Sequence, residues 1–450
     1  METLRDLYLD HKSYADKEVN LSGWLRNNRA QKEFGFIDLS DGTTFKTVQV
    51  VYDNKLSNFV EVQHIRCGAS ISVKGKFVLT PEAKQPFEIH AEEVVLLGDS
   101  GDDYPIQPKR HTREFLRELP HLRVRTNLFN AVFRVRSEAA YAIHTFFHDK
   151  GFTYVHTPII TSNDGEGAGQ LFSVTTASKN PQTDFFGKNV FLTVTGQLHV
   201  EPYAMAFRNV YTFGPAFRAE NSNTQKHASE FWMIEPEFAF ADLNDEMNLA
   251  EELVKYIIAH ILKNCPDEMA FFDSFVEKGL INRLNAVLNS KEFVRITHHD
   301  AISLLKECGV KFENTPEYGE DLATEHEKFL TNHFNGPVFV YNWPKDIKAF
   351  YMRLNDDGET VAASDLLVPE SGELVGGSQR EERLDVLLNR MNELHMKEET
   401  LDWYVDTRRY GGCVHSGFGL GFERLIMFLT GVDNIRDVES YPRTPNNCDF

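Results

Sequence analysis

Two stretches of the sequence decide the fold: Phe217-Arg-Ala-Glu220, continued after a polar loop by Glu230-Phe-Trp-Met-Ile-Glu-Pro-Glu237, and Gly417-Phe-Gly-Leu-Gly-Phe-Glu-Arg424. The first predicts an antiparallel hairpin. Because alternate side chains of a strand share a face, it would gather an arginine, an aromatic ring and several carboxylates: Arg218, Glu220, Phe231, Glu235 and Glu237. Charges in such apolar strands are costly unless a ligand or a partner satisfies them. The hairpin therefore predicts a binding site, with cross-strand Arg–Glu pairs in a purely structural hairpin as the alternative.

The second stretch predicts a strand with few side chains that leads into an apolar helix. Gly419 and Gly421 would let a flat base lie on the backbone, and Phe231 could hold an adenine ring. Two arginines, Arg218 and Arg424, suit a polyphosphate. The spacing matches neither a P-loop nor a Rossmann fingerprint. Together the two stretches predict an ATP site of another kind.

Further polar residues lie between these stretches in the sequence. Asp365 and Glu373 could approach across a turn and hold magnesium bound to nucleotide phosphates, although a surface hairpin is the alternative. Arg380, just after two glycines, could recognise a planar oxygen-bearing group. His227 lies in the loop over the expected phosphate site, whereas the other histidines show no metal-ligand spacing.

Length and patterning predict two domains in an α+β chain of 450 residues. Five short alternating segments between residues 18 and 97 favour a five-stranded OB-type β-barrel, which commonly binds single-stranded nucleic acid; another small barrel is the alternative. We expect a barrel domain at 1–100, a basic hinge at 101–130, and a second domain at 131–450. A helical insertion is expected at about 245–330.

Charge and cysteine content limit the function classes. The net charge of −20 argues against a nucleic-acid partner, but Lys109 to Arg136 forms a basic strip with eight Lys and Arg residues against two Glu. By charge alone this strip is better explained as a solvated connector. Five scattered cysteines favour neither zinc nor a disulfide scaffold. No apolar run approaches membrane-spanning length, so we expect a cytoplasmic protein without membrane contact.

Taken together, these segments resemble the three signature motifs of class II aminoacyl-tRNA synthetases: a helix and strand ending at Pro158, the Arg218-to-Glu237 hairpin, and Gly417 to Leu425. The resemblance spans nearly the whole chain. It implies a catalytic domain built on an antiparallel sheet flanked by helices. An OB barrel ahead of that domain points to the aspartyl, asparaginyl and lysyl subgroup, and Val194-Thr-Gly-Gln-Leu-His-Val-Glu201 looks asparaginyl.

The resemblance implies a role for each matching residue. Arg218 and Arg424 would bind the ATP phosphates, Phe231 would stack on adenine and Glu220 would orient the base. Asp365 and Glu373 become magnesium ligands. Glu166, Gln197 and Thr195 would hold the ammonium group of the amino acid. The implied reaction joins L-asparagine to tRNA(Asn) through an adenylate and releases pyrophosphate and AMP.

Charge in the pocket would select asparagine over aspartate. Aspartyl enzymes are similar here but carry a lysine at the position of Val200, which would neutralise the carboxylate of aspartate. Without that lysine, aspartate would face Glu235, which repels a carboxylate and accepts from an amide N–H. Arg380 would meet the amide oxygen.

On the barrel, Arg29, Phe36 and Gln49 lie where the family reads the anticodon. An aromatic platform with polar neighbours suits splayed bases, although Phe36 could instead belong to the barrel core. The basic strip falls at the hinge, where the tRNA backbone would pass. The first motif builds a two-fold interface in this class, so the resemblance also implies a homodimer.

Three alternatives stay open. An aspartyl-tRNA synthetase is disfavoured by Val200 and Glu235. A paralogue that makes free asparagine is disfavoured by the attached barrel, which such relatives lack. A catalytically silent tRNA-binding protein on this scaffold is disfavoured because the expected ATP and metal residues are intact.

Overall fold

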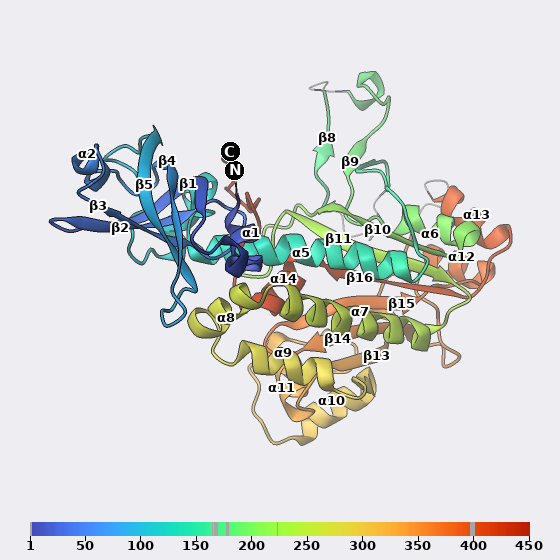
Figure 1. Cartoon of the computed structure of the whole chain (residues 1–450). Helices are drawn as coiled ribbons and strands as arrows, with labels where there is room; N and C mark the ends of the chain where they lie inside the picture. Colours follow the sequence, from blue (N-terminus) through green and yellow to red (C-terminus); the bar gives the residue numbers. More distant parts are fainter. Residues whose placement is uncertain (1, 164, 166–169, 177–179, 223, 397–400) are drawn as a thin grey trace. The chain divides into compact units, whose positions relative to one another are not determined.

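The structure is a computed structural model that describes residues 2–163, 165, 170–176, 180–222, 224–396 and 401–450. Its internal contacts divide the chain into two compact units, Met1–Ala131 and Val132–Phe450. Figure 1 colours the chain along the sequence, with the barrel in blue.

The first unit is a closed five-stranded barrel with the strand order β1-β2-β3-β5-β4, as the sequence predicts. Alternating burial along the strands fills its interior with aliphatic side chains and leaves polar residues outside. Its strands are β1 (Glu18–Ala30), β2 (Phe34–Ser40), β3 (Val48–Asp53), β4 (Ser70–Leu79) and β5 (Phe87–Gly98). Its helices are α1 (Leu4–Leu9), α2 (Phe59–Gln63), α3 (Arg113–Arg117) and α4 (Pro120–Arg123), with a 3-10 turn η1 (His11–Tyr14).

The second unit is built on an eight-stranded sheet with the order β12-β13-β14-β15-β16-β11-β10-β6. Its pairs are antiparallel except β10 with β6 and β12 with β13. The strands are β6 (Thr153–Tyr154), β10 (Asn209–Phe217), β11 (Glu230–Ala239), β12 (Val294–Thr297), β13 (Val338–Pro344), β14 (Thr360–Val368), β15 (Gly372–Gln379) and β16 (His415–Gly421). A separate small sheet contains β7 (Ile160–Thr161), β8 (Ser173–Val174) and β9 (Val190–Leu192).

Helices flank this sheet (Figure 1). The long helices α5 (Asn127–Asp149) and α7 (Leu243–Asn264) run side by side, and His260 of α7 contacts Glu138 of α5 at 2.7 Å. The start of α7 is fixed by a capping box between Asp242 and Asp245. The other helices are α6 (Gln197–Phe207), α8 (Pro266–Phe275), α9 (Leu280–Asn289), α10 (His298–Glu307), α11 (Thr324–His333), α12 (Leu384–Glu393), α13 (Asp402–Arg409) and α14 (Phe422–Thr430). Short 3-10 turns are η2 (Pro181–Thr183), η3 (Lys345–Ile347) and η5 (Ile435–Asp437).

The segment expected as a helical insertion at about 245–330 holds α7 to α10 and most of α11, and it also contains a strand. Strand β12 joins the edge of the main sheet in parallel with β13. Four residues are too few for the sequence pattern to separate a strand from a helix–helix connection. No helix in the described part of the chain combines the length and apolar character needed to cross a membrane.

Candidate active site

The predicted ATP and magnesium residues gather at one face of the main sheet, on strands β11, β14, β15 and β16, with Arg218 just after β10 and Arg424 at the start of α14. Strand β11 pairs with β16 so that Met233 lies opposite Gly421 and Glu237 lies opposite Gly417. The Arg218 guanidinium lies 5.3 Å from the centre of the Phe231 ring. The attraction between a cation and the face of an aromatic ring helps to hold both side chains in place. We call the residues Arg218, Phe231, Asp365, Glu373 and Arg424 the nucleotide end of the catalytic face.

Two carboxylates converge at the nucleotide end. Glu373 Oε1 and Asp365 Oδ1 lie 3.3 and 3.5 Å from the position that a Cβ atom at Gly376 would take. Arg424 Nη1 donates to Glu373 Oε2 at 3.3 Å and to the Glu373 carbonyl at 3.1 Å. Lys348 Nζ donates to Asp365 Oδ2 at 2.6 Å. The two carboxylates therefore lie close together over Gly376, and each is paired with a cation.

Burial and neighbouring charges shift the pKa values of these two acids in opposite directions. Burial raises the pKa of Asp365 to about 6, while Lys348 limits that rise and Glu373 adds to it. Burial also disfavours the ionised form of Glu373, but Arg424 and Lys348 outweigh it and lower its pKa. Both groups are therefore mainly carboxylates at neutral pH, the form that binds hard cations.

The glycines of β16 do not all have the same environment. A Cβ atom at Gly417 would lie 2.2 Å from Glu237 Oε1, so only glycine leaves room for that carboxylate. A Cβ at Gly419 would lie 2.8 Å from the end of the Met233 side chain, whereas one at Gly421 would make ordinary contact with Arg424 at 3.8 Å. The strict need for glycine is therefore at Gly417, where a buried acid takes the space.

The loop between β10 and β11 brings Glu220 and His227 near each other. His227 Nε2 lies 4.0 Å from Glu220 Oε2, and its Nδ1 contacts the Thr224 hydroxyl at 2.5 Å. The His227 side chain is 42% exposed, so it can meet a ligand without leaving a packed position.

A second group of predicted residues surrounds the start of α6. Glu235 Oε2 accepts from the Gly196 N–H at 2.7 Å, and its Oε1 accepts from the Thr195 hydroxyl. The Gln197 N–H donates to the Thr195 hydroxyl at 3.0 Å, while its buried Nε2 atom contacts no hydrogen-bond acceptor among the described residues. Buried polar atoms are nearly always bonded, so the Gln197 amide is suited to a ligand.

Arg380 has a different environment from the one the sequence predicts. Its Nη2 and Nε donate to Glu237, at 2.5 and 3.1 Å, and its Nη1 donates to the Ser378 hydroxyl at 2.7 Å. A guanidinium has five N–H groups, so two are left for other acceptors. Glu237 neutralises the charge of Arg380. We call Thr195, Gln197, Glu235, Glu237 and Arg380 the amino-acid end.

Val200 is fully buried in an apolar cluster with Val155, Ala204 and Val210. An ammonium group placed there would meet packed aliphatic side chains, so Val200→Lys would disturb this cluster as well as the pocket charge. Glu166 lies outside the described residues.

On the barrel, the three predicted anticodon residues form one cluster on the outer surface. Arg29 pairs with Phe36 across β1 and β2, and its guanidinium lies 5.7 Å from the centre of the Phe36 ring. Arg29 Nη2 donates to Gln49 Oε1 at 3.2 Å and to Asp38 Oδ1 at 3.3 Å. Phe36 is half-buried, whereas its neighbour Ile37 is fully buried. Phe36 therefore does not belong to the barrel core.

Several charged residues at these sites could not be recognised from the sequence. Lys348 and Glu327 come from segments far from the motifs, and Lys226 sits in the polar loop with no distinguishing pattern. A Cβ at Gly372 would lie 2.3 Å from Glu327 Oε2 and 3.1 Å from Lys226 Nζ, so both reach the turn that precedes Glu373. Only tertiary proximity identifies such residues.

Comparisons with known proteins agree with this geometry. Residues 112–445 match the family of class II tRNA synthetases (D, K and N), and residues 19–97 match the OB-fold nucleic acid binding domain. An asparagine–tRNA ligase from Acholeplasma laidlawii is 63% identical over 461 residues, covering 100% of this chain and 99% of that protein. Another from Clostridium beijerinckii is 56% identical, with 99% of each chain covered.

A solved structure is also similar. The asparaginyl-tRNA synthetase of Pyrococcus horikoshii, complexed with asparaginyl-adenylate, has 33% sequence identity and a TM-score of 0.87, covering 97% of this chain and 96% of that one. The full-length match at this identity, the barrel and the antiparallel catalytic sheet all agree. The chain belongs to the asparagine–tRNA ligases, within the class II aminoacyl-tRNA synthetases.

Proposed function

We propose that this chain performs the reaction of its family, the ATP-dependent ligation of L-asparagine to tRNA(Asn), with the nucleotide and amino-acid ends dividing the work. The observation that carries this division is that both ends lie at one face of the sheet, where β11 carries Phe231 of one end and Glu235 of the other, and β16 pairs with both β11 and β15. ATP and asparagine would therefore meet in line over these strands.

The first step is attack of the asparagine carboxylate on the α-phosphorus of ATP. A P–O bond forms to the carboxylate and the bond to pyrophosphate breaks, which yields asparaginyl-adenylate. Arg218 and Arg424 would bind the phosphates and stabilise the charge of the pentavalent transition state. Phe231 would stack on adenine, over the floor that includes Gly419 and Gly421. Glu220 and His227 would orient the base and the outer phosphates from the loop.

Asp365 and Glu373 would hold Mg²⁺. No group of three or more His, Cys, Asp or Glu positioned for a metal occurs among the described residues. Two converging carboxylates nevertheless fit Mg²⁺, which commonly takes one or two protein carboxylates and fills its other positions with phosphate oxygens and water. When bound, Mg²⁺ supplies positive charge to the phosphate groups. The ion pairs with Lys348 and Arg424 would keep the two acids in place before ATP arrives.

At the amino-acid end, Gln197, Thr195 and Glu166 would hold the ammonium group. The Gln197 amide can present its oxygen to an ammonium by a rotation about its last bond. Arg380 would donate to the side-chain amide oxygen with an N–H that Glu237 does not use, and Glu235 would accept from the amide N–H.

Charge explains the preference for asparagine over aspartate. Arg380 is neutralised by Glu237, so it offers hydrogen bonds but little net charge to a carboxylate. Glu235 would repel that carboxylate, and Val200 leaves it without a counter-ion. An unpaired buried charge costs several kcal/mol, and about 1.4 kcal/mol corresponds to tenfold in binding. Direct rejection of aspartate therefore needs no second site.

In the second step, the terminal 3′-hydroxyl of the tRNA attacks the carbonyl carbon of the adenylate and AMP leaves. The cluster of Arg29, Phe36 and Gln49 would bind anticodon bases by stacking and hydrogen bonding. The basic strip from Lys109 to Arg125, apart from the fully buried Arg123, would contact the tRNA backbone, and this binding should weaken with salt.

A homodimer is part of this proposal and rests on the resemblance of α5 and the following strand to the first class II motif. Exposed aromatic side chains occur on α5 and α6: Tyr141, Tyr203 and Phe207. Sedimentation analysis at micromolar concentration should give a mass near twice 51.6 kDa. A concentration-independent monomer that is fully active would exclude the dimer.

The decisive experiment is amino-acid-dependent ATP–pyrophosphate exchange without tRNA, with asparagine and aspartate compared. Exchange with asparagine alone is the expected result. Exchange with aspartate alone would refute the pocket assignment while keeping the ATP site, and exchange with neither would refute the proposed catalysis.

A further inference from the structure

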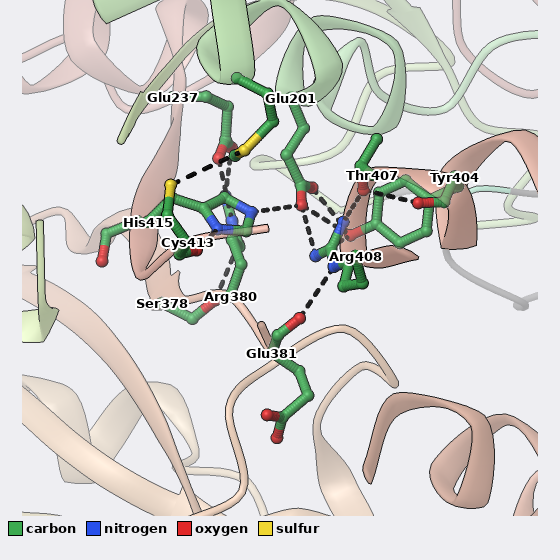
Figure 2. A network of polar contacts seen from close by, with 12 residues as sticks. Glu201, Glu237, Ser378, Arg380, Glu381, Tyr404, Thr407, Arg408, Cys413 and His415 are labelled. Atoms are coloured by element: carbon green, nitrogen blue, oxygen red, sulfur yellow. Dashed lines mark hydrogen bonds and ion pairs between the residues drawn. The ribbon is translucent and has the colours of Figure 1, made fainter. Parts of the chain in front are cut away.

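The chain buries a polar network next to the amino-acid end that none of the proposed steps uses. Figure 2 shows Glu201 at its centre, between Arg408, Tyr404 and His415. Glu201 accepts from Arg408 Nη2 at 2.5 Å, from His415 Nε2 at 2.7 Å and from the Tyr404 hydroxyl at 2.8 Å. The side chains of Glu201 and Arg408 are 0% exposed. The network joins helix α6, helix α13 and the start of strand β16.

His415 links Glu201 to the backbone at the start of strand β16. Its Nδ1 faces the Cys413 carbonyl at 2.7 Å and its Nε2 faces Glu201 Oε1. Glu201 is therefore held by three side chains, those of Arg408, Tyr404 and His415.

Residues of this network form hydrogen bonds to the backbone at Arg380 and at the residue after it. The Arg380 N–H donates to the backbone carbonyl of His415 at 2.9 Å. One residue further, the Glu381 carbonyl accepts from Arg408 Nε at 2.8 Å. Arg408 thus links Glu201 directly to the backbone next to Arg380, whereas His415 contacts Glu201 with its ring and Arg380 with its backbone carbonyl.

Glu201 also has a direct link to the pocket through its own helix. It lies one turn of α6 after Gln197, on the helix whose start surrounds Glu235. A buried group of charges adds little net stability compared with apolar side chains of similar volume. What it adds is a fixed geometry, because every donor and acceptor must meet its partner.

We propose that Glu201 is a positioning residue for asparagine specificity, which aligns Arg380 with the pocket through Arg408 and His415. This proposal rests on the proposed contact of Arg380 with the amino acid. The network would hold the guanidinium where it reaches an amide oxygen while staying paired to Glu237. Loss of the network would misalign asparagine and leave the nucleotide end unchanged.

The test uses the full chain and the pyrophosphate exchange assay. Glu201→Gln keeps the size of the side chain but removes its charge, and it should raise the KM for asparagine about tenfold, the size expected for a lost charge-assisted hydrogen bond. The KM for ATP should stay within about twofold of the wild-type value. Arg409→Ala is the control, because Arg409 lies on the same helix and forms ion pairs with Asp402 and Asp406.

A second variant covers the case in which Glu201→Gln does not fold, as judged by circular dichroism. Tyr404→Phe removes a single donor to Glu201 and should shift the asparagine KM in the same direction by a smaller factor. An unchanged asparagine KM in the folded variants, or an equal rise in both KM values, would overturn the proposal.

A double-mutant cycle separates this proposal from the role of Arg380 itself. If Glu201 acts through Arg380, its substitution should have little further effect on the asparagine KM in an Arg380→Lys background. Additive effects would overturn the positioning role. An Arg380→Lys variant with wild-type asparagine KM would instead show that the assigned role of Arg380 is wrong.

Discussion

The nucleotide end and the amino-acid end lie on the same sheet face but hold their charges differently. At the nucleotide end, the side chains of Arg424 and Glu373 are 32% and 42% exposed and their closest atoms are 3.3 Å apart. At the amino-acid end, Arg380 and Glu237 are 3% and 0% exposed and make two hydrogen bonds.

This difference suggests how each end meets its ligand. A partly exposed ion pair contributes about 0–1 kcal/mol, so phosphate oxygens can replace it at little cost. A buried pair is costly to break because one charge would be left unpaired. We therefore expect the amino-acid end to bind as a preformed pocket, and the nucleotide end to exchange its internal pairs for contacts with ATP.

The largest expected effect comes from removing Arg218, one of the two arginines proposed to bind the phosphates. Arg218→Ala should lower the exchange rate by about 100-fold or more, because a positioned cation at the transition state is worth that much. The measurement is kcat for pyrophosphate exchange, with Arg409→Ala as the exposed-arginine control. Near-normal turnover in a folded Arg218→Ala variant would break the assignment of the nucleotide end.

A substitution of Glu235 tests whether the amino-acid end is a preformed pocket. Glu235→Gln should raise the KM for asparagine about tenfold, because the bonds to Thr195 and the Gly196 N–H lose their charge-assisted partner. It should also reduce the preference for asparagine over aspartate, since a repelling charge is gone. Glu230→Gln, an exposed position on the same strand, is the control. An unchanged preference would show that Glu235 does not select the side chain.

A variant on the barrel tests a region outside both the nucleotide end and the amino-acid end. Gln49→Ala should lower the rate of tRNA charging several-fold, because one base contact and the bond to Arg29 are lost. Pyrophosphate exchange without tRNA should be unaffected. Glu93→Ala, at an exposed position of β5, serves as the control. Equal losses in both assays would contradict an anticodon role.

The smallest effect is expected behind the sheet, at Glu246 of α7. Burial raises the pKa of this carboxyl to about 8, although the Ser364 hydroxyl that bonds to it opposes the shift. The folded state thus keeps a proton that the unfolded state loses near pH 4.5, so stability falls as pH rises from about 4.5 to 8.

The matching variant is Glu246→Gln, which removes this titration and keeps the shape of the side chain. Its thermal unfolding midpoint should rise relative to that of the wild type between pH 5 and pH 8. Parallel pH curves for the two proteins would show that Glu246 is ionised in the folded chain.

The sequence predicted the architecture because its signals are local. Alternation between residues 18 and 97 marks five strands, and the structure places them at nearly the same bounds. The glycine pattern from Gly417 to Gly421 and the Arg218 hairpin likewise lie in continuous segments. Each of these features can be recognised from neighbouring residues alone.

The pairing of charges could not be predicted in this way. Arg380 and Glu237 are 143 residues apart, and Arg408 and Glu201 are 207 apart. No local pattern shows that Arg380 is neutralised by a buried acid, or that Lys348 pairs with Asp365. The sequence therefore predicted which residues lie near one another at the sheet face better than it predicted what each one contacts.

The segment between β11 and β13 has a consequence for protein engineering. Its strand β12 closes an edge of the main sheet, its helix α7 carries Glu246 behind the floor, and Glu327 of α11 reaches the turn at Gly372. Excising it to obtain a minimal catalytic module would expose a sheet edge and remove a carboxylate beside Glu373. A truncated or grafted version of this catalytic unit must keep the whole segment to remain an adenylate-forming enzyme.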